Sequence, residues 1–213
     1  RVLYNGTDLY ANYEAQKDQI GYVPQDDIIH VELTPRQAFT YAARLRLPKD
    51  TSAAEIRQLV GETLVTLGLD ERADIRISRL SGGQRKRVSL GVELLTRCKA
   101  LFLDEPTSGL DPATEARMMQ LFRRLSDQGR TIVVTTHVME NIDLLDKVAV
   151  MYRGRLVFYG PPDNAMKFFK AKRATLLYDK LEEATPEEWE ARFRATDDYR
   201  KYSGDARIGG DTP

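Results

Sequence analysis

The sequence lacks the features that mark several classes of protein. It has a single cysteine, Cys98, so no internal disulfide can form, which fits a reducing compartment. No apolar run approaches the roughly 18–20 residues that cross a bilayer, and no secretory signal begins at the first residue. Basic and acidic residues both number 32, so the charge balance gives no argument for nucleic acid as a partner. A chain of 213 residues can form one large domain, or one domain with a subdomain.

One stretch, residues 80–111, organises the rest of the chain. It reads LSGGQRKRVSLGVELLTRCKALFLDEPTSGLD and predicts a glycine turn, a helix, a strand and a polar loop. Because Gly82 and Gly83 open the helical pattern, the first N–H groups of that helix are available to an anion. The apolar run 100–103 predicts a strand buried on both faces, and Asp104 and Glu105 follow it directly. Open α/β sheets place their ligands at such strand ends.

The segments around this stretch alternate between strand and helix patterns. Residues 20–23 predict a short strand that Pro24 closes, and residues 131–135 predict a buried strand that precedes His137. Capping boxes at 34–37 and 52–55 begin two helices, and Asp111 caps a third that extends to about residue 127. A hairpin is expected about residues 153–154.

The C-terminal segment carries an aromatic stripe. Trp189, Phe193 and Tyr199 lie near one face of a helix that a capping box begins at Thr185. Such a stripe either docks on the parent domain or lies on a membrane surface, and the many acidic residues favour docking. Residues 203–213 are rich in glycine and aspartate and predict a linker or a frayed end.

Two motifs in the central stretch resemble those of the ATP-binding cassette (ABC) proteins. Residues 80–84 match the LSGGQ signature, and ALFLDEPTSGLD resembles the Walker B strand followed by the D-loop. The segments IGYVPQDD, GQRKRVSLGVELL and HVMENIDLLDKVAVMYRGRLVFYGPP are most similar to the White or ABCG-like exporters. Gln84 stands where those exporters often have glutamate, which makes bacterial homologues of that type the nearer comparison.

The resemblance implies an α/β fold, a RecA-like P-loop NTPase core of the ABC type with a helical subdomain. No G-x-x-x-x-G-K-[ST] motif, which would cradle the phosphates, occurs in the chain. In the family that Walker A loop precedes the Q-loop, so the sequence resembles an ABC domain that is N-terminally truncated. The expected parts are the end of an N-terminal β region with the Q-loop at 1–33, a helical subdomain at 34–79, the signature, Walker B, D-loop and H-loop core at 80–170, and a helical tail with linker at 171–213.

The resemblance also assigns roles to residues, with ATP and Mg²⁺ as cofactors. Asp104 and the Q-loop residue Gln25 would hold Mg²⁺ through water, Glu105 would polarise the attacking water, and His137 would contact the γ-phosphate. Glu105, His137 and Gln25 are therefore the expected catalytic residues. A nucleotide bound to a second ABC domain would be contacted by the signature residues Ser81, Gly82, Gly83 and Gln84. The D-loop comprises Ser108, Gly109, Leu110 and Asp111.

The assembly that the resemblance implies is a head-to-tail dimer of ABC ATPase domains joined to a transmembrane domain, which is expected further along the same gene. The chain would then work at the cytoplasmic face of the cell membrane and couple ATP-driven dimerisation to export, with no role for nucleic acid. By itself it is expected to be inactive, because the Walker A lysine is absent. A soluble ABC ATPase outside transport and a degenerate regulatory cassette are the alternatives, and intact Glu105 and His137 argue against the second.

Overall fold

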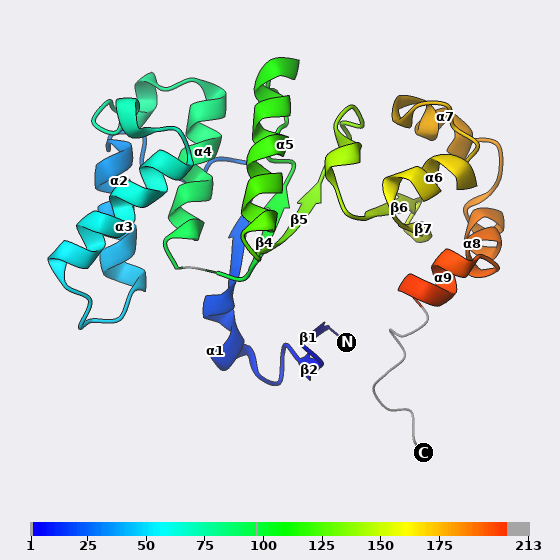
Figure 1. The fold of residues 1–213 in the computed structure, drawn as a ribbon, viewed down its shortest axis with the longest axis horizontal. Coiled ribbons are helices and arrows are strands. Elements are labelled where there is room, and N and C mark those ends of the chain that lie inside the picture. Colours follow the sequence, from blue (N-terminus) through cyan, green and yellow to red (C-terminus); the bar gives the residue numbers. More distant parts are fainter. Residues whose placement is uncertain (1, 97, 204–213) are drawn as a thin grey trace. The chain divides into compact units, whose positions relative to one another are not determined.

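The computed structural model describes residues 2–96 and 98–203. They form two compact units, of which the first ends at His137 and the second begins at Val138 (Figure 1). Among the described residues no helix has both the length and the apolar character needed to cross a membrane.

A three-stranded parallel sheet is the centre of the first unit. The strands β3 (Ile20–Val23), β4 (Ala100–Asp104) and β5 (Thr131–Thr135) are paired in the order β3-β4-β5. Their register places Ile20 beside Ala100 and Ala100 beside Thr131, so the carboxyl ends of all three strands meet at one edge. The α/β class and the two strand positions at 20–23 and 131–135 are confirmed.

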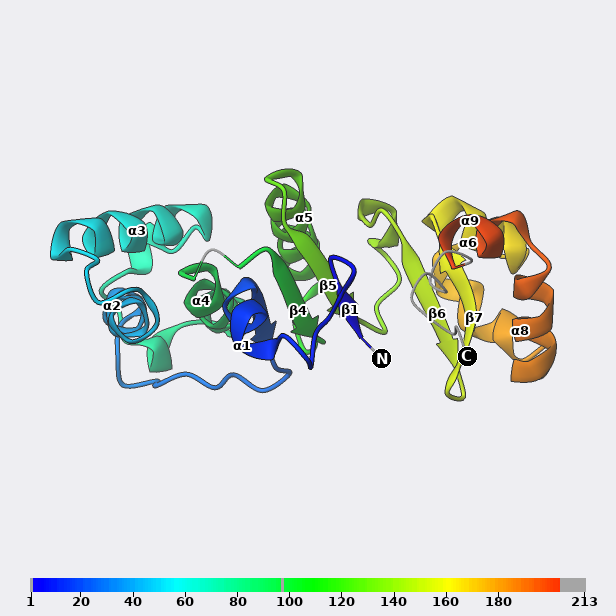
Figure 2. The same cartoon turned by 90° about the horizontal axis from the view of Figure 1, so that it is seen from below.

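Two helices cover one face of this sheet. They are α4 (Gly82–Leu94), which packs on β3, and α5 (Pro112–Asp127), which packs on β5 (Figures 1 and 2). Leu101 and Leu103 of β4 are buried at alternate positions, as expected for side chains that point to a covered face.

The opposite face carries a row of exposed side chains. Tyr22, Phe102 and Val133 are register partners across the three strands and are 55%, 42% and 41% exposed. The expectation that residues 100–103 and 131–135 are buried strands is therefore wrong for this face. The reason is that, within the part of the first unit that the structure describes, no element buries these side chains.

A helical layer lies beside the sheet and includes α2 (Pro35–Arg46), α3 (Ala53–Thr66) and α4 (Figure 1). Both predicted capping boxes are present, with Thr34 and Ser52 as the N-caps. The helix α3 ends before Gly68, whose φ of 62° favours glycine. Gly91 allows α4 to approach α2 closely, because a Cβ at this position would lie 2.2 Å from the Phe39 ring.

Shorter elements complete the first unit. The strands β1 (Leu3–Tyr4) and β2 (Thr7–Asp8) form a hairpin about Asn5 and Gly6, and the short helix α1 (Tyr13–Gln16) follows. Single 3₁₀ turns occur at Lys17–Gln19, Asp70–Arg72 and Ile77–Arg79.

The second unit is a hairpin covered by helices. Strands β6 (Val148–Tyr152) and β7 (Arg155–Gly160) are antiparallel and turn at residues 153–154, as predicted. Within the described residues, the hairpin is followed by the helices α6 (Pro162–Phe168), α7 (Leu177–Leu181), α8 (Pro186–Arg194) and α9 (Asp197–Tyr202). The 3₁₀ turns of this unit are at Ile142–Leu144 and Ala174–Leu176.

The aromatic stripe of the C-terminal segment packs into this second unit. Trp189 and Phe193 are 4% and 1% exposed and belong to one core with Phe158 and Phe169. The buried indole N–H of Trp189 donates to the carbonyl of Leu181 at 3.0 Å. Docking of the stripe is thus confirmed, whereas the predicted linker at 203–213 lies almost entirely outside the described residues.

Candidate functional site

The carboxylate of Asp104 is held by two hydroxyl groups at the carboxyl edge of the sheet. Thr135, its register partner on β5, donates to Oδ1 at 2.6 Å, and Tyr22 on β3 donates to Oδ2 at 3.3 Å. Partial desolvation of the hydroxyl and the nearby Asp104 carboxylate both raise the pKa of Tyr22. Neighbouring strands therefore fix the orientation of this carboxylate.

Glu105 has an unusual backbone conformation. Its φ is 41°, in the left-handed region that few residues other than glycine adopt. The backbone N–H of Glu105 donates to the Thr135 carbonyl at 3.2 Å and to the Thr135 hydroxyl at 3.0 Å. These bonds hold the chain as it leaves β4, and strain of this kind is concentrated at functional sites in proteins. The turn separates the direction of the Glu105 side chain from that of Asp104.

The Glu105 carboxylate lies close to the other two expected catalytic residues, Gln25 and His137. Gln25, in the loop after β3, donates from Nε2 to Oε2 of Glu105 at 3.3 Å. His137, which follows β5, places Nδ1 at 3.5 Å from the same oxygen. Three strand ends thus bring together Gln25, Glu105 and His137, with Asp104 adjacent. The exposed fraction of the Glu105 side chain is 34%, so the carboxylate is open to a small molecule.

The signature residues occupy the first turn of α4. Ser81 is the N-cap: its hydroxyl accepts the Gln84 N–H at 3.3 Å, and the Gln84 side-chain oxygen accepts the Ser81 N–H at 3.0 Å. Gln84 therefore completes a capping box, which requires a glutamine or a glutamate at this third helical position. Within the described part of the chain, no hydrogen bond or ion pair joins the signature residues 81–84 to the side chains of Gln25, Glu105 and His137.

The two signature glycines meet different surroundings. A Cβ at Gly83 would lie 2.5 Å from Cγ2 of Thr114 in the first turn of α5, so this position has no room for a side chain. A Cβ at Gly82 would meet only Cδ2 of Leu110, at 3.8 Å. Packing against Thr114 thus requires glycine at residue 83, whereas the space beside Gly82 is nearly unobstructed.

The D-loop connects β4 to α5 through a series of turns. The N–H of Ser108 donates to the Glu105 carbonyl at 3.1 Å, and Gly109 has a φ of 74°. Leu110 follows, and Asp111 caps α5 by accepting the N–H of Thr114 at 3.0 Å. The side-chain and backbone hydrogen bonds of Thr114 lower the pKa of Asp111. Helix capping accounts for Asp111 without any further role.

Two residues of the cluster, Tyr22 and Thr135, were not predicted from the sequence. Their signal was weak, because a tyrosine within a strand and a threonine at its end are ordinary residues. Both become recognisable once the parallel register is known, since a hydroxyl at the end of β5 must then lie beside Asp104.

The cluster offers oxygen ligands suited to Mg²⁺. Among the described residues, no group of three or more His, Cys, Asp or Glu side chains is arranged to hold a metal ion. Mg²⁺ is usually bound by one or two carboxylates together with water and phosphate oxygens. The Asp104 carboxylate and the Gln25 amide oxygen fit this mode of binding, in which the nucleotide supplies the remaining ligands.

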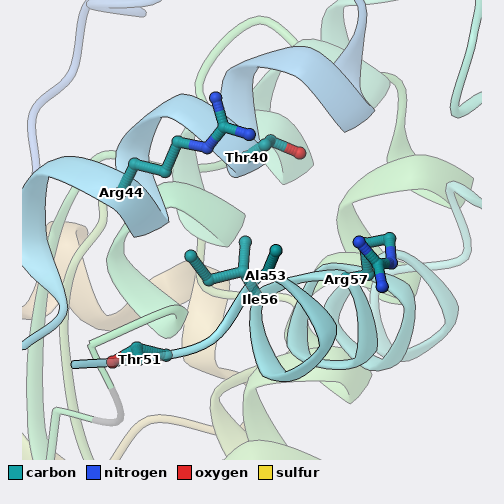
Figure 3. Close-up of a pocket in the computed structure, with 6 residues that line it drawn as sticks. All are labelled: Thr40, Arg44, Thr51, Ala53, Ile56 and Arg57. Atoms are coloured by element: carbon teal, nitrogen blue, oxygen red, sulfur yellow. The ribbon is translucent and has the colours of Figure 1, made fainter. Parts of the chain in front are cut away.

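A separate hollow of about 330 Å³ lies in the helical layer (Figure 3). None of the expected site residues lines it. It is formed by Thr40, Arg44, Thr51, Ala53, Ile56 and Arg57.

The fold and the edge cluster define a class of protein. A parallel sheet whose carboxyl edge carries two adjacent carboxylates fits a nucleotide-binding core of the P-loop NTPase class. The family model described as "ABC transporter" matches residues 1–108, which is half of the chain and includes the signature and Asp104. The chain belongs to the ABC transporter family, and it is similar in particular to the ATPase domain of ABCG-like members.

Similarity to characterised transporters extends past the matched region. The chain is 44% identical over 162 residues to the ABC transporter ATP-binding/permease protein Rv1747 of Mycobacterium tuberculosis, covering 76% of this chain and 19% of that protein. It is 39% identical over 175 residues to the broad substrate specificity ATP-binding cassette transporter ABCG2 of Rattus norvegicus, covering 79% and 26%. For ABC transporter G family member 13 of Arabidopsis thaliana the identity is 36%, covering 79% and 25%. The chain thus spans about a fifth to a quarter of the length of these relatives.

Proposed function

We propose that this chain supplies the catalytic carboxylates and the signature of an ATP-hydrolysing domain that drives transport across a membrane. The observation that supports this most directly is the convergence of Gln25 and His137 on the Glu105 carboxylate, beside Asp104. These groups come from three strand ends, and the same chain carries the signature at the N-terminus of α4.

The proposed chemistry is transfer of the γ-phosphoryl group of ATP to water. The water oxygen forms a bond to phosphorus, the bond to the β,γ-bridging oxygen breaks, and Glu105 accepts the water proton. Gln25 positions the Glu105 carboxylate by its hydrogen bond, and His137 contacts the γ-phosphate. When bound by Asp104 and Gln25, Mg²⁺ supplies charge neutralisation on the phosphates. Positioning and electrostatics are the main sources of catalysis in this reaction class.

A second ABC ATPase domain is the proposed partner of the signature. In a head-to-tail dimer, Ser81, Gly82 and Gly83 would contact the phosphates of ATP bound to the partner, and the D-loop would lie at the same interface. The unhindered surface of Gly82 and the position of both glycines in the first turn of a 13-residue helix support this role. Gln84 takes part through its cap with Ser81, which fixes the loop beside the partner's nucleotide.

The transport role rests on the relatives, which are named as transporters. We place the chain at the cytoplasmic face of the cell membrane, joined to a transmembrane domain, with export as the direction. A soluble ABC ATPase outside transport and a regulatory cassette remain the competing proposals. The chain contains no G-x-x-x-x-G-K-[ST] motif. The 213 residues alone should therefore not hydrolyse ATP, and hydrolysis requires a polypeptide that also includes this loop.

The experiment measures Mg-ATP hydrolysis and dimer fraction for the full-length gene product and its Glu105→Gln variant. The substitution keeps the size and hydrogen bonding of the side chain but removes the charge that accepts the proton. We expect hydrolysis to fall by on the order of 10² or more, the range for lost acid–base assistance, while ATP-bound dimer accumulates. Glu71→Gln, at an exposed site in the helical layer, is the matched control and should behave as the wild type. Unchanged turnover in Glu105→Gln, with no trapped dimer, would exclude the catalytic role.

A further inference from the structure

The helix that begins with the signature also holds the loop that carries Gln25. Lys86, one turn into α4, donates from its ammonium group to the backbone carbonyl of Gln25. The same ammonium group lies 3.6 Å from Oδ1 of Asp27. The hydroxyl of Ser89 donates to that Asp27 oxygen at 2.8 Å. Lys86 and Ser89 of α4 thus contact this loop at the Gln25 carbonyl and at the Asp27 carboxylate.

These contacts are shielded from solvent. The side chains of Lys86 and Asp27 are only 11% and 21% exposed, and Ser89 is 8% exposed. Surface ion pairs contribute little because water and salt screen them, but this pair is desolvated on most sides. The second acceptor within reach of the Ser89 hydroxyl, the Arg85 carbonyl, is farther away at 3.4 Å, so Asp27 is the better partner.

Both contacts with the loop come from one face of α4. Lys86 and Ser89 are three residues apart, so they project from the same face of α4 toward the loop. Gln25 then donates to Glu105 at 3.3 Å. A continuous series of contacts therefore runs from the helix of the signature, through Asp27 and the Gln25 backbone, to the catalytic carboxylate.

We infer that Lys86 and Asp27 are positioning residues for Gln25: this largely shielded pair fixes the loop so that the Gln25 amide stays within hydrogen-bonding distance of Glu105. This inference rests on the proposed ATP hydrolysis. A displacement of the loop by about 1 Å would break a 3.3 Å hydrogen bond, and misplacements of that size can lower a rate by about 10². Lys86 itself need not touch the nucleotide for this effect.

The main test compares kcat and KM for Mg-ATP in the full-length gene product and in three variants. Lys86→Met removes the charge and both contacts, and kcat should fall by about ten- to a hundredfold with little change in KM. Lys86→Arg keeps a cationic donor and should recover most of the activity. Lys99→Met, at an exposed lysine just beyond α4, is the matched control and should leave both constants unchanged.

A double-mutant cycle asks whether the pair acts as a unit. Asp27→Asn removes the negative charge while keeping an acceptor for Ser89, so its effect on kcat should be smaller than that of Lys86→Met. If the two residues position the loop together, the double variant should lose little more than Lys86→Met alone. Fully multiplicative losses would show independent effects and would overturn the paired role.

Loop mobility gives a readout that does not depend on turnover. Ile28 is 83% exposed and Cys98, the only native cysteine of this chain, is buried, so a nitroxide label can be attached selectively to Ile28→Cys in the 213-residue chain. Lys86→Met should raise the mobility of the label, and Lys99→Met should not. Raised mobility with normal kcat would reduce the pair to a structural contact and overturn the inference. If the full-length wild type does not hydrolyse Mg-ATP, the proposed function fails, whereas a wild-type rate in Lys86→Met contradicts only the positioning role.

Discussion

The same substitution should have opposite effects at two helical glycines, Gly91 and Gly61. Within a helix, glycine is less favourable than alanine by about 0.5–1 kcal/mol, because it has more backbone freedom to lose on folding. Gly61 lies within α3 and a Cβ there would meet nothing within 4 Å, so Gly61→Ala should stabilise the protein by that amount. Gly91 lies within α4, where a Cβ would be 2.2 Å from the ring of Phe39 and 2.7 Å from Leu67.

The cost at Gly91 follows from the rigidity of its neighbours. Phe39 is fully buried and Leu67 is 1% exposed, so neither side chain can move into solvent. Overpacking of this kind costs roughly 1–3 kcal/mol. Against the helical gain of about 0.5–1 kcal/mol, Gly91→Ala should be destabilising, by up to about 2.5 kcal/mol.

The assay must report on the helical layer itself. The single tryptophan, Trp189, belongs to the second unit, so its fluorescence does not follow α4. Hydrogen exchange of peptides from α3 and α4, measured with urea unfolding by circular dichroism, supplies the free energies. Stabilisation by Gly91→Ala comparable to that by Gly61→Ala would refute the close approach of α2 and α4.

Two further predictions concern the strand ends and the D-loop. Thr135→Val removes the hydroxyl that bridges Asp104 and the Glu105 N–H, so ATP turnover of the full-length product should fall. Thr135→Ser keeps the hydroxyl and should keep the wild-type turnover. Equal turnover in the two variants would show that the bridge has no role in catalysis. Asp111→Asn keeps a capping acceptor without the charge. Because hydrogen bonding lowers the pKa of Asp111 in the folded state, its charge stabilises the fold above the usual carboxyl pKa of about 3.9 and this stabilisation is lost as the pH falls through the lowered value. The difference in unfolding free energy between wild type and Asp111→Asn should therefore shrink in acid, and a pH-independent difference would contradict this.

Local signals in the sequence were sufficient for most of the elements. The caps at Thr34 and Ser52 and the turn at residues 153–154 depend on residues within four positions of one another, so they can be read without the fold. The gathering of Gln25, Asp104, Glu105 and His137 could also be anticipated, because parallel strands that end together bring their following residues to one edge.

Other features depend on partners that are distant in the sequence. The apolar run 100–103 does not reveal that Phe102 faces an uncovered side of the sheet, since burial is decided by which helices pack there. The Thr135 bridge required the register of β4 against β5. The capping role of Gln84 is local by contrast, because Ser81 and Gln84 stand at the spacing of a capping box.

The absence of a side chain at Gly83 lets the signature lie directly against the D-loop and the start of α5. A Cβ at residue 83 would lie 2.5 Å from Cγ2 of Thr114, so the first turn of α4 packs directly against a β-branched side chain in the first turn of α5. Leu110, near the end of the D-loop, contacts both signature glycines, since its Cδ2 lies 3.8 Å from the Cβ position of each. A side chain added at residue 83 would therefore have to push the signature and the D-loop apart, so one substitution would disturb both segments.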